Sequence, residues 1–377
     1  MLTYTAAVTD IRRVADRRDF RRFIDYAYER NAADPHWVPP LRLSEHERLT
    51  PAKNPFFEHA DVDLLLASRG DRIVGRIAAI DDRLHNDTHR DNVAMFGFFE
   101  AEDEDASHAL LASVEAWARA RGRSAVRGPM NPSLNESAGL LVDGFDADPV
   151  LMMPHNPREY AAHIESAGYS KIKDLFAWTY DLRSGPPAAI VKLAARLRDK
   201  HGVTVRQLNL KEFTREVERL RAIYSAAWER NWGFVPPTAA EFRRLAAELK
   251  PIFDPRGALV AEVGGDVVAC LVAVPDINQA LKGTSGRLLG LALPRLLLRK
   301  RYITQLRLLL LGVDARYRAF GLYPLLIHEW GQRLRGSQYT TAEFSWVLED
   351  NRDINQPAEM AGARRYKTYR IYEKAVA

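Results

Sequence analysis

The sequence predicts an α/β protein made of two tandem copies of one α+β fold, each a mixed, mostly antiparallel sheet flanked by helices. Three observations indicate this. The chain has 377 residues, which is more than one ordinary hydrophobic core holds. Each half contains two apolar runs separated by a glycine turn, which is the pattern of a β-hairpin. The order of strand and helix patterns around each hairpin is the same in both halves.

The first copy begins with a predicted helix over residues 19–31, where Phe20, Phe23 and Ile24 recur at helical spacing. A proline-rich loop follows. The run DVDLLLASRGDRIVGRIAAID is then expected to form a hairpin that turns at Gly70. The remaining predicted elements are strand 93–100, helix 107–121, an irregular segment 124–145 with strand-like ends, helix 157–169 and strand 174–182.

The run Arg183-Ser184-Gly185-Pro186-Pro187 resembles a linker and divides the chain into predicted domains 1–185 and 186–377. After it, the same order of elements recurs. The predicted elements are strand 203–209, helices 210–230 and 237–249, hairpin 257–276, strand 307–313, helix 321–335, strand 340–349 and strand 367–375. The second hairpin turns at Gly264-Gly265.

Composition restricts the class of protein. The hydrophobic fraction is 47% and the charged fraction 27%, as in soluble globular proteins. The N-terminus lacks a signal-peptide pattern, and no run of about 18 apolar residues occurs. We therefore expect a cytoplasmic protein, with peripheral attachment to the inner face of the cytoplasmic membrane as a further option. The net charge of +5 suits an anionic partner such as a phosphate-bearing cofactor or a membrane.

The segment LLLLGVDARYRAFGLYPLLIHEWGQRL, from Leu308 to Leu334, is predicted to pass directly from a strand into a helix. Such a turn leaves unpaired backbone N–H groups that attract an anion, most simply a phosphate. Gly321 stands at the expected helix start and Arg318 adds a positive charge. On spacing alone, an ordinary strand-to-helix connection explains the segment equally well.

The run Val313 to Tyr323 resembles V-x-x-x-x-R-x-x-G-x-[G/A], the acyl-CoA pyrophosphate loop of the GCN5-related N-acetyltransferase (GNAT) superfamily. Arg318 and Gly321 match the motif, whereas Tyr323 departs from its final small residue. The resemblance implies acyl-CoA as acyl donor, no metal, and a binding set of Leu311, Val313, Arg318, Ala319, Phe320, Gly321, Leu322 and Tyr323. In the first copy, the acidic run 101–105 replaces this loop, so we interpret that copy as degenerate and without cofactor.

Short segments along the whole chain resemble, as a set, a tandem-domain bacterial family that includes the bacterial ceramide synthases. They include PHWVPPL, NPFFEHA, RGPMNPSLNES, MMPHNP, RNWGFVP, FSWVLEDN and KTYRIYEK. This resemblance implies transfer of an acyl group to an amine, here the amine of a long-chain lipid such as a sphingoid base.

Direct acyl transfer to an amine needs a proton acceptor and donors for the oxyanion, but no protein nucleophile. Glu343 is the first candidate for the base, because a carboxylate inside an apolar strand is costly unless it is used or paired. Its structural alternative is an ion pair with Arg316 or Arg318. Asp350 and Tyr366 are the other catalytic candidates. The resemblance implies that the backbone near Val313 polarises the thioester carbonyl.

Four loop residues are candidates for contact with the substrate: Asn231, Trp232, Asp276 and Asn278. Binding residues concentrate on loops, although Asn and Asp also favour turns for local reasons. Asp81, His85, Asp87 and His89 are interpreted as a polar loop rather than as metal ligands, and no metal is expected. Cys270 lies in an apolar strand and is expected in the core.

The stretch 287–307, RLLGLALPRLLLRKRYITQLR, interleaves leucines with basic residues and contains no acid. This pattern suits an anionic membrane surface. The alternative is a core helix whose arginines extend to solvent.

The leading function is an acyl-CoA-dependent N-acyltransferase acting on a lipid amine. Three alternatives stay open, namely an aminoacyl-tRNA-dependent transferase of the peptidoglycan-branching type, a small-molecule N-acetyltransferase and a non-enzymatic lipid-binding protein. Because the Arg318–Gly321 loop favours CoA, no nucleic acid partner is expected.

Overall fold

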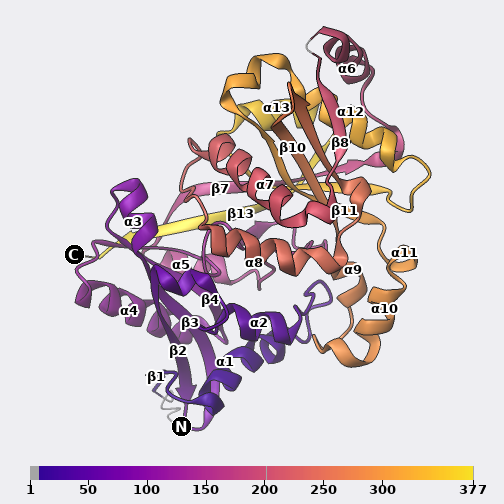
Figure 1. Cartoon of the computed structure of the whole chain (residues 1–377). Coiled ribbons are helices and arrows are strands. Elements are labelled where there is room, and N and C mark those ends of the chain that lie inside the picture. Colours follow the sequence, from indigo (N-terminus) through magenta and orange to yellow (C-terminus); the bar gives the residue numbers. More distant parts are fainter. Residues whose placement is uncertain (1–7, 201, 377) are drawn as a thin grey trace. The chain divides into compact units, whose positions relative to one another are not determined.

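The computed structural model describes residues 8–200 and 202–376. The chain divides into two compact units (Figure 1). Unit 1 comprises Met1–Leu175, Gly283–Leu288 and Lys367–Ala377, and unit 2 comprises Phe176–Lys282 and Leu289–Tyr366. The chain therefore leaves and re-enters each unit. The division into domains 1–185 and 186–377 stays a prediction.

The strands of unit 1 follow the order β1-β2-β3-β4-β5-β13, with β6 paired to β13. All pairs are antiparallel except β4–β5, which is parallel. The bounds are β1 Asp10–Arg13, β2 Ala60–Arg69, β3 Arg72–Asp82, β4 Val93–Ala101, β5 Ala125–Gly128, β6 Leu140–Asp143 and β13 Arg364–Ala375. The predicted hairpin is confirmed as β2–β3.

Helices cover both faces of this sheet. On one face, α4 (Glu104–Ala120) packs Leu110, Leu111 and Val114 onto the core. On the other, Arg76 of β3 donates a hydrogen bond to the Phe23 carbonyl of α1 at 3.0 Å. The other helices are α1 Arg17–Arg30, α2 Arg42–Arg48, the 3-10 turn Pro55–Glu58, α3 Arg83–His89 and α5 Tyr160–Ser166.

The strands of unit 2 follow the order β12-β11-β10-β9-β8, and only β11–β12 is parallel among these pairs. The bounds are β8 Thr204–Gln207, β9 Ala258–Val263, β10 Asp266–Pro275, β11 Gln305–Val313 and β12 Thr341–Leu348. Strand β7 (Ser170–Asp181) contains the boundary between the units. The hairpin, parallel pair and intervening helix of unit 1 (β2–β3, β4–α4–β5) thus recur as β9–β10 and β11–α12–β12.

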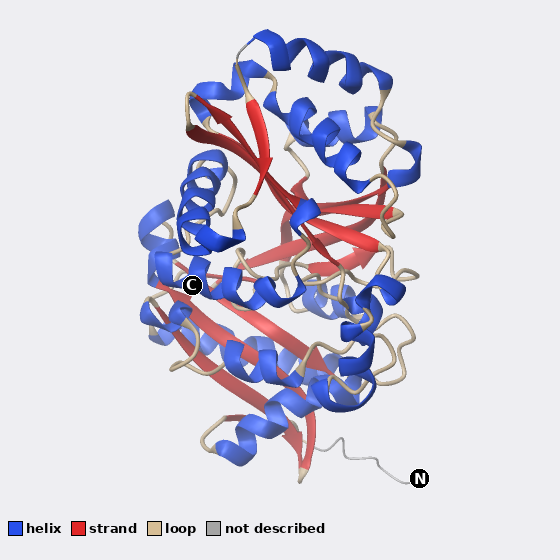
Figure 2. Cartoon of the chain, turned by 45° about the vertical axis from the view of Figure 1, so that its right-hand side comes forward, coloured by secondary structure: helices blue, strands red, loops and turns tan. Residues whose placement is uncertain are grey.

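Helices again lie against the strands in unit 2 (Figure 2). Helix α7 packs Val217, Leu220 and Ile223 against β9 and β10, where Cys270 is buried as expected. The helices are α6 Ala188–Lys200, α7 Phe213–Trp228, α8 Ala239–Leu249, α9 Asn278–Leu281, α10 Leu293–Leu297, α11 Arg299–Tyr302, α12 Leu322–Leu334 and α13 Arg352–Met360.

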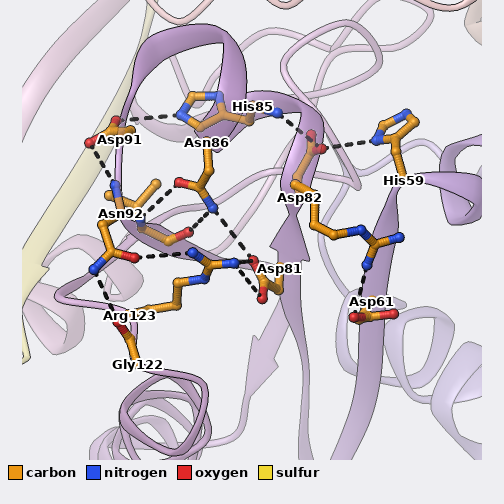
Figure 3. A network of polar contacts seen from close by, with 12 residues as sticks. His59, Asp61, Asp81, Asp82, His85, Asn86, Asp91, Asn92, Gly122 and Arg123 are labelled. Carbon is orange, nitrogen blue, oxygen red and sulfur yellow. Dashed lines mark hydrogen bonds and ion pairs between the residues drawn. The ribbon is translucent and has the colours of Figure 1, made fainter.

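The interpretation of Asp81, His85, Asp87 and His89 as a polar loop is wrong: they lie at the end of β3 and in α3. Asp82 caps this helix through the His85 N–H at 3.2 Å and contacts His59 Nδ1 at 2.9 Å (Figure 3). Hydrogen bonds between polar side chains, which carry no periodic apolar signal, hold this segment. Within the described part of the chain, no group of three or more His, Cys, Asp or Glu side chains is placed to hold a metal ion.

Candidate active site

The turn between β11 and α12 offers backbone donors to a ligand. A 3-10 segment, Ala315–Phe320, leads from the strand to Gly321, which has φ +70° and precedes α12. No described side chain caps the N-terminus of α12. In unit 1 the matching helix α4 is capped, because the Asp103 carboxylate accepts from the Ala106 N–H at 2.9 Å. The second copy therefore leaves free a position that the first copy fills with its own carboxylate.

The two arginines of this turn have different surroundings. Arg316 forms an ion pair with Asp314 at 2.7 Å. Arg318 is exposed, donates to the Ala227 carbonyl at 3.3 Å and forms no ion pair with a described residue. The alternative in which Glu343 pairs with either arginine is therefore wrong. Arg318 is the cation of this turn that is available to an anionic ligand.

Gly321 is in close contact with unit 2's first helix. A Cβ atom at this position would lie 2.8 Å from Leu197 Cδ1 of α6. Leu197, and not an open space, therefore lies where a side chain at position 321 would point. The glycine is required both by its positive φ and by this leucine.

Tyr323 is folded back onto the end of β11. Its hydroxyl lies near the Val313 backbone N–H, and burial raises the pKa of the phenol above its ordinary value. The departure from the small residue of the motif thus has a definite consequence. The tyrosine hydroxyl lies beside the backbone N–H that the resemblance assigns to the thioester carbonyl.

The other predicted cofactor residues differ in accessibility. Leu311 lies on β11 and is half-buried, whereas Leu322 is fully buried in the first turn of α12. Phe320 packs edge-on against Tyr317, with ring centroids 5.2 Å apart. Ala319 belongs to the 3-10 segment, and its side chain is outside the described part.

The parallel strands β11 and β12 pair over only four residues, from Gln305–Thr341 to Leu308–Phe344. Beyond Phe344 no further pair joins the two described strands, although β11 continues to Val313. Five residues of strand span about 17 Å. The edge of β11 between its last pair with β12 and the turn into α12 is therefore not paired with β12.

Glu343 lies one residue before this point of separation. Its side chain has 0% exposure, and the Tyr366 hydroxyl donates a hydrogen bond to it. Arg307, its register partner on β11, is also buried and donates to the Ser345 carbonyl at 3.3 Å. The structure thus brings Glu343 and Tyr366 together, whereas Asp350 lies exposed in the turn after β12.

The four predicted substrate residues separate into two pairs. Asn231 and Trp232 follow the C-terminus of α7, where a Cβ atom at Gly312 would lie 2.6 Å from the Trp228 ring. Asp276 is buried at the other end of β11, where its N–H donates to the Gln305 carbonyl at 3.0 Å. Its carboxylate accepts from the Asn278 N–H at 3.2 Å, which is a local turn contact.

Sequence reasoning missed two residues of this site. Arg307 could have been found, because it is the one charge in an otherwise apolar strand, as Glu343 is in its own strand. Leu197 gave no signal, because its helix was not predicted and its contact with Gly321 spans more than one hundred residues of sequence.

The stretch 287–307 is broken into short helical pieces that expose apolar side chains. Leu289 is 80% exposed and Leu297 is 75% exposed. The other exposed large apolar residues here are Leu288, Leu291, Leu293, Leu298 and Tyr302. The alternative of a core helix is therefore wrong for this stretch. No helix among residues 8–200 and 202–376 is long and apolar enough to cross a membrane.

Comparison with known proteins identifies relatives along the whole chain. No protein-family model matches it. The bacterial ceramide synthase of Caulobacter vibrioides is 38% identical over 366 residues, which are 95% of each protein. Protein YghO of Escherichia coli is 35% identical over 386 residues, covering 100% of this chain and 97% of YghO. A tandem GNAT protein from the clavulanic acid biosynthesis pathway shares the fold, with 14% identity and a TM-score of 0.57. The match covers 98% of this chain and 99% of that protein.

Proposed function

Because this chain belongs to the family of the bacterial ceramide synthases and is an acyltransferase, we propose that it transfers an acyl group from acyl-CoA to the amine of a long-chain lipid. Membership of this family favours a sphingoid base as the acceptor, and the product of that reaction is a ceramide. The reaction is direct attack of the amine on the thioester, without an acyl-enzyme intermediate.

The observation that carries this proposal is the buried pair of Glu343 and Tyr366 at the point where β11 and β12 part. Glu343 is fully buried, and a carboxylate is costly there unless it is used or hydrogen-bonded. A carboxylate beside a strand edge that is not paired with β12 is suited to accept a proton from an amine. Glu343 and the uncapped helix α12 belong to the same unit, unit 2.

The residues divide the chemistry as follows. The amine nitrogen bonds to the thioester carbon, its surplus proton passes to the Glu343 carboxylate, and the carbon–sulfur bond breaks to release the thiolate of CoA. The Val313 N–H stabilises the oxyanion. Arg318 and the first N–H groups of α12 hold the pyrophosphate. Asn231 and Trp232 are proposed to contact substrate from the adjacent loop.

We further propose that the stretch 287–307 contacts an anionic membrane surface, on the inner face of the cytoplasmic membrane. A lipid acceptor stays in a bilayer, because each methylene removed from water contributes about 0.8 kcal/mol. The exposed leucines of this stretch suit the interface, and its basic residues suit anionic headgroups.

The test is incubation of the purified protein with labelled acyl-CoA of several chain lengths and a panel of amines. The panel contains a sphingoid base and a short soluble amine. A separate assay uses aminoacyl-tRNA as the donor and a peptidoglycan precursor as the acceptor. We expect labelled amide and free CoA with the sphingoid base, and much slower formation of both with the Glu343→Gln variant. Transfer only from aminoacyl-tRNA would indicate a transferase of the peptidoglycan-branching type instead. Acylation only of the short amine would indicate a small-molecule N-acetyltransferase, and lipid binding without any transfer would indicate a non-enzymatic lipid-binding protein.

A further inference from the structure

Unit 1 contains an open groove of about 1090 Å³ that the proposed acyl transfer does not use. It lies between α1, α2 and the face of β2. Its floor is apolar and includes Phe20, Phe57, Val62 and Leu64, each of them only partly buried. Val62 and Leu64 point to the same face of β2 because side chains two residues apart on a strand share a face. A ligand can therefore cover apolar surface here that the chain itself leaves open.

Five arginines line this groove, against two aspartates. Two of the arginines are already paired: Arg13 with Asp63 at 2.7 Å and Arg42 with Asp25. The other lining aspartate, Asp16, accepts from two N–H groups in the first turn of α1. Arg17, Arg21 and Arg287 form no ion pair with a described residue, and all three are exposed. The groove thus combines an apolar floor with three uncompensated positive charges.

The chain holds Arg287 at this groove through the residues just before it. The Arg42 N–H donates to the Gly286 carbonyl at 2.8 Å, and the Arg42 guanidinium donates to the Ser285 carbonyl at 3.1 Å. Gly286 is buried at φ +72°, and a Cβ atom there would lie 2.4 Å from the Pro40 carbonyl oxygen. Only glycine fits this position, so the segment 283–288 is a specific part of unit 1.

We propose that this groove binds one anionic phospholipid, with its phosphate on Arg17, Arg21 and Arg287 and an acyl chain along the apolar floor. Charge complementarity selects the headgroup, because a guanidinium matches phosphate geometry. The apolar floor selects a lipid over a free anion. The proposal deepens the membrane contact and rests on it, because Arg287 is also the first residue of the exposed stretch 287–307.

The experiment measures binding of dioctanoyl phosphatidic acid, kept below its micelle concentration, by calorimetry and native mass spectrometry. Dioctanoyl phosphatidylcholine and inorganic phosphate are the comparison ligands. We expect one phosphatidic acid per chain, with much weaker binding of both comparison ligands. Equal binding of inorganic phosphate would reduce the groove to a general anion site and overturn the proposal.

Charge-reversal variants locate the site. Arg17→Glu and Arg21→Glu should each weaken binding of phosphatidic acid about tenfold or more. Arg18→Glu is the matched control, because it makes the same charge change on the same helix at an exposed residue that does not line the groove. Affinity unchanged in both groove variants, or reduced equally in the control, would overturn the assignment.

These measurements contain neither acyl-CoA nor an amine. Failure of lipid binding therefore leaves the acyl-transfer proposal standing, and absence of acyl transfer leaves the groove assignment standing. A Gly286→Ala variant gives a second readout, because displacement of Arg287 should weaken phosphatidic acid binding without any change of charge. Normal lipid affinity in this variant, together with a normal circular-dichroism spectrum, would show that Arg287 is not part of the site.

Discussion

The Tyr366 hydroxyl donates a hydrogen bond to the carboxylate of Glu343, which is fully buried beside the separation of β11 and β12. The two residues come from different strands, so the fold alone brings them together. A hydrogen bond to a buried carboxylate stabilises its charged form. The structure thus places a hydrogen-bonded carboxylate, the kind of group that amine acylation requires as proton acceptor, inside unit 2.

Glu343→Gln should slow acyl transfer on the order of 10²–10⁴-fold, because the amide cannot accept the proton of the amine. Single-turnover rates with labelled acyl-CoA measure this. Glu359→Gln is the matched control, because it makes the same chemical change at an exposed residue of α13 that is no catalytic candidate. If the Glu343→Gln enzyme is folded and as fast as the parent, another group acts as the base.

Arg318→Ala should weaken CoA binding about tenfold to a hundredfold, on the scale of a charge-assisted hydrogen bond. Arg316→Ala should have a much smaller effect, because that guanidinium is already paired with Asp314. Calorimetric titration with CoA compares the affinities of the two variants, which have the same net charge. Equal losses in both would show a diffuse electrostatic effect rather than a specific phosphate contact.

Gly321→Ala should destabilise the protein for two separable reasons. The positive φ costs a residue with a side chain about 1–2 kcal/mol. The new methyl group also meets Leu197, whose Cδ1 would lie 2.8 Å away. Leu197→Ala in the same chain should remove the second cost, so the free energy of unfolding of the double variant should exceed the additive value by about 1 kcal/mol. Strict additivity in urea unfolding would show that the contact is absent.

Protonation of His85 should oppose folding. Burial, together with the neighbouring Arg127, lowers the pKa of His85 to about 4 from 6.5. Between these values the unfolded chain binds a proton that the folded chain does not, so stability falls as the pH falls. The contribution is complete above about pH 6.5 and decreases by about 1.4 kcal/mol per pH unit toward pH 4.

His85→Asn removes this titration. The free energy of unfolding of the parent should therefore fall more steeply than that of the variant between pH 6.5 and pH 5, by about 2 kcal/mol in total. Urea unfolding monitored by circular dichroism at several pH values measures both slopes. Parallel slopes would show that His85 titrates alike in the folded and unfolded chain.

The sequence allowed prediction of elements whose signal is local. Both hairpins and the turn into α12 were predicted, because alternating apolar residues and glycine turns are local properties. Helix α3 was missed because polar side chains hold it, as where the Asp82 carboxylate accepts from the His85 backbone N–H. Helix α6 follows the proline-rich break directly and was missed, because no element was predicted between residues 188 and 202.

The candidate site was predicted in part for the same reason. The isolation of Glu343 within an apolar strand is visible in the sequence, but its partner Tyr366 lies on a separate strand. The proximity of the Tyr323 hydroxyl to Val313 likewise depends on the placement of α12 after β11. Such pairings arise from tertiary structure, which residue spacing does not encode.

The exposed leucines of the stretch 287–307 provide the sharpest test of membrane contact. Leu289 and Leu297 are 80% and 75% exposed, so replacing both by asparagine should leave folding unchanged. Vesicle binding should weaken by at least about 2 kcal/mol, because two leucines no longer leave water. Met360→Asn is the matched control, because Met360 is 86% exposed and lies outside the stretch.

Charge reversal at Lys300 and Arg301 tests the same contact by its electrostatics. Both residues are exposed, whereas the neighbouring Arg299 donates to the Pro251 carbonyl at 2.8 Å and is better left intact. Sedimentation with anionic vesicles should show weaker binding of the double glutamate variant, most clearly at low salt, where screening is least. Acylation of a sphingoid base on vesicles should fall more than acylation of a short soluble amine. If binding to anionic vesicles and both acylation rates match those of the parent, the basic residues of this stretch do not contact the membrane, and the leucine variant alone decides whether the stretch does.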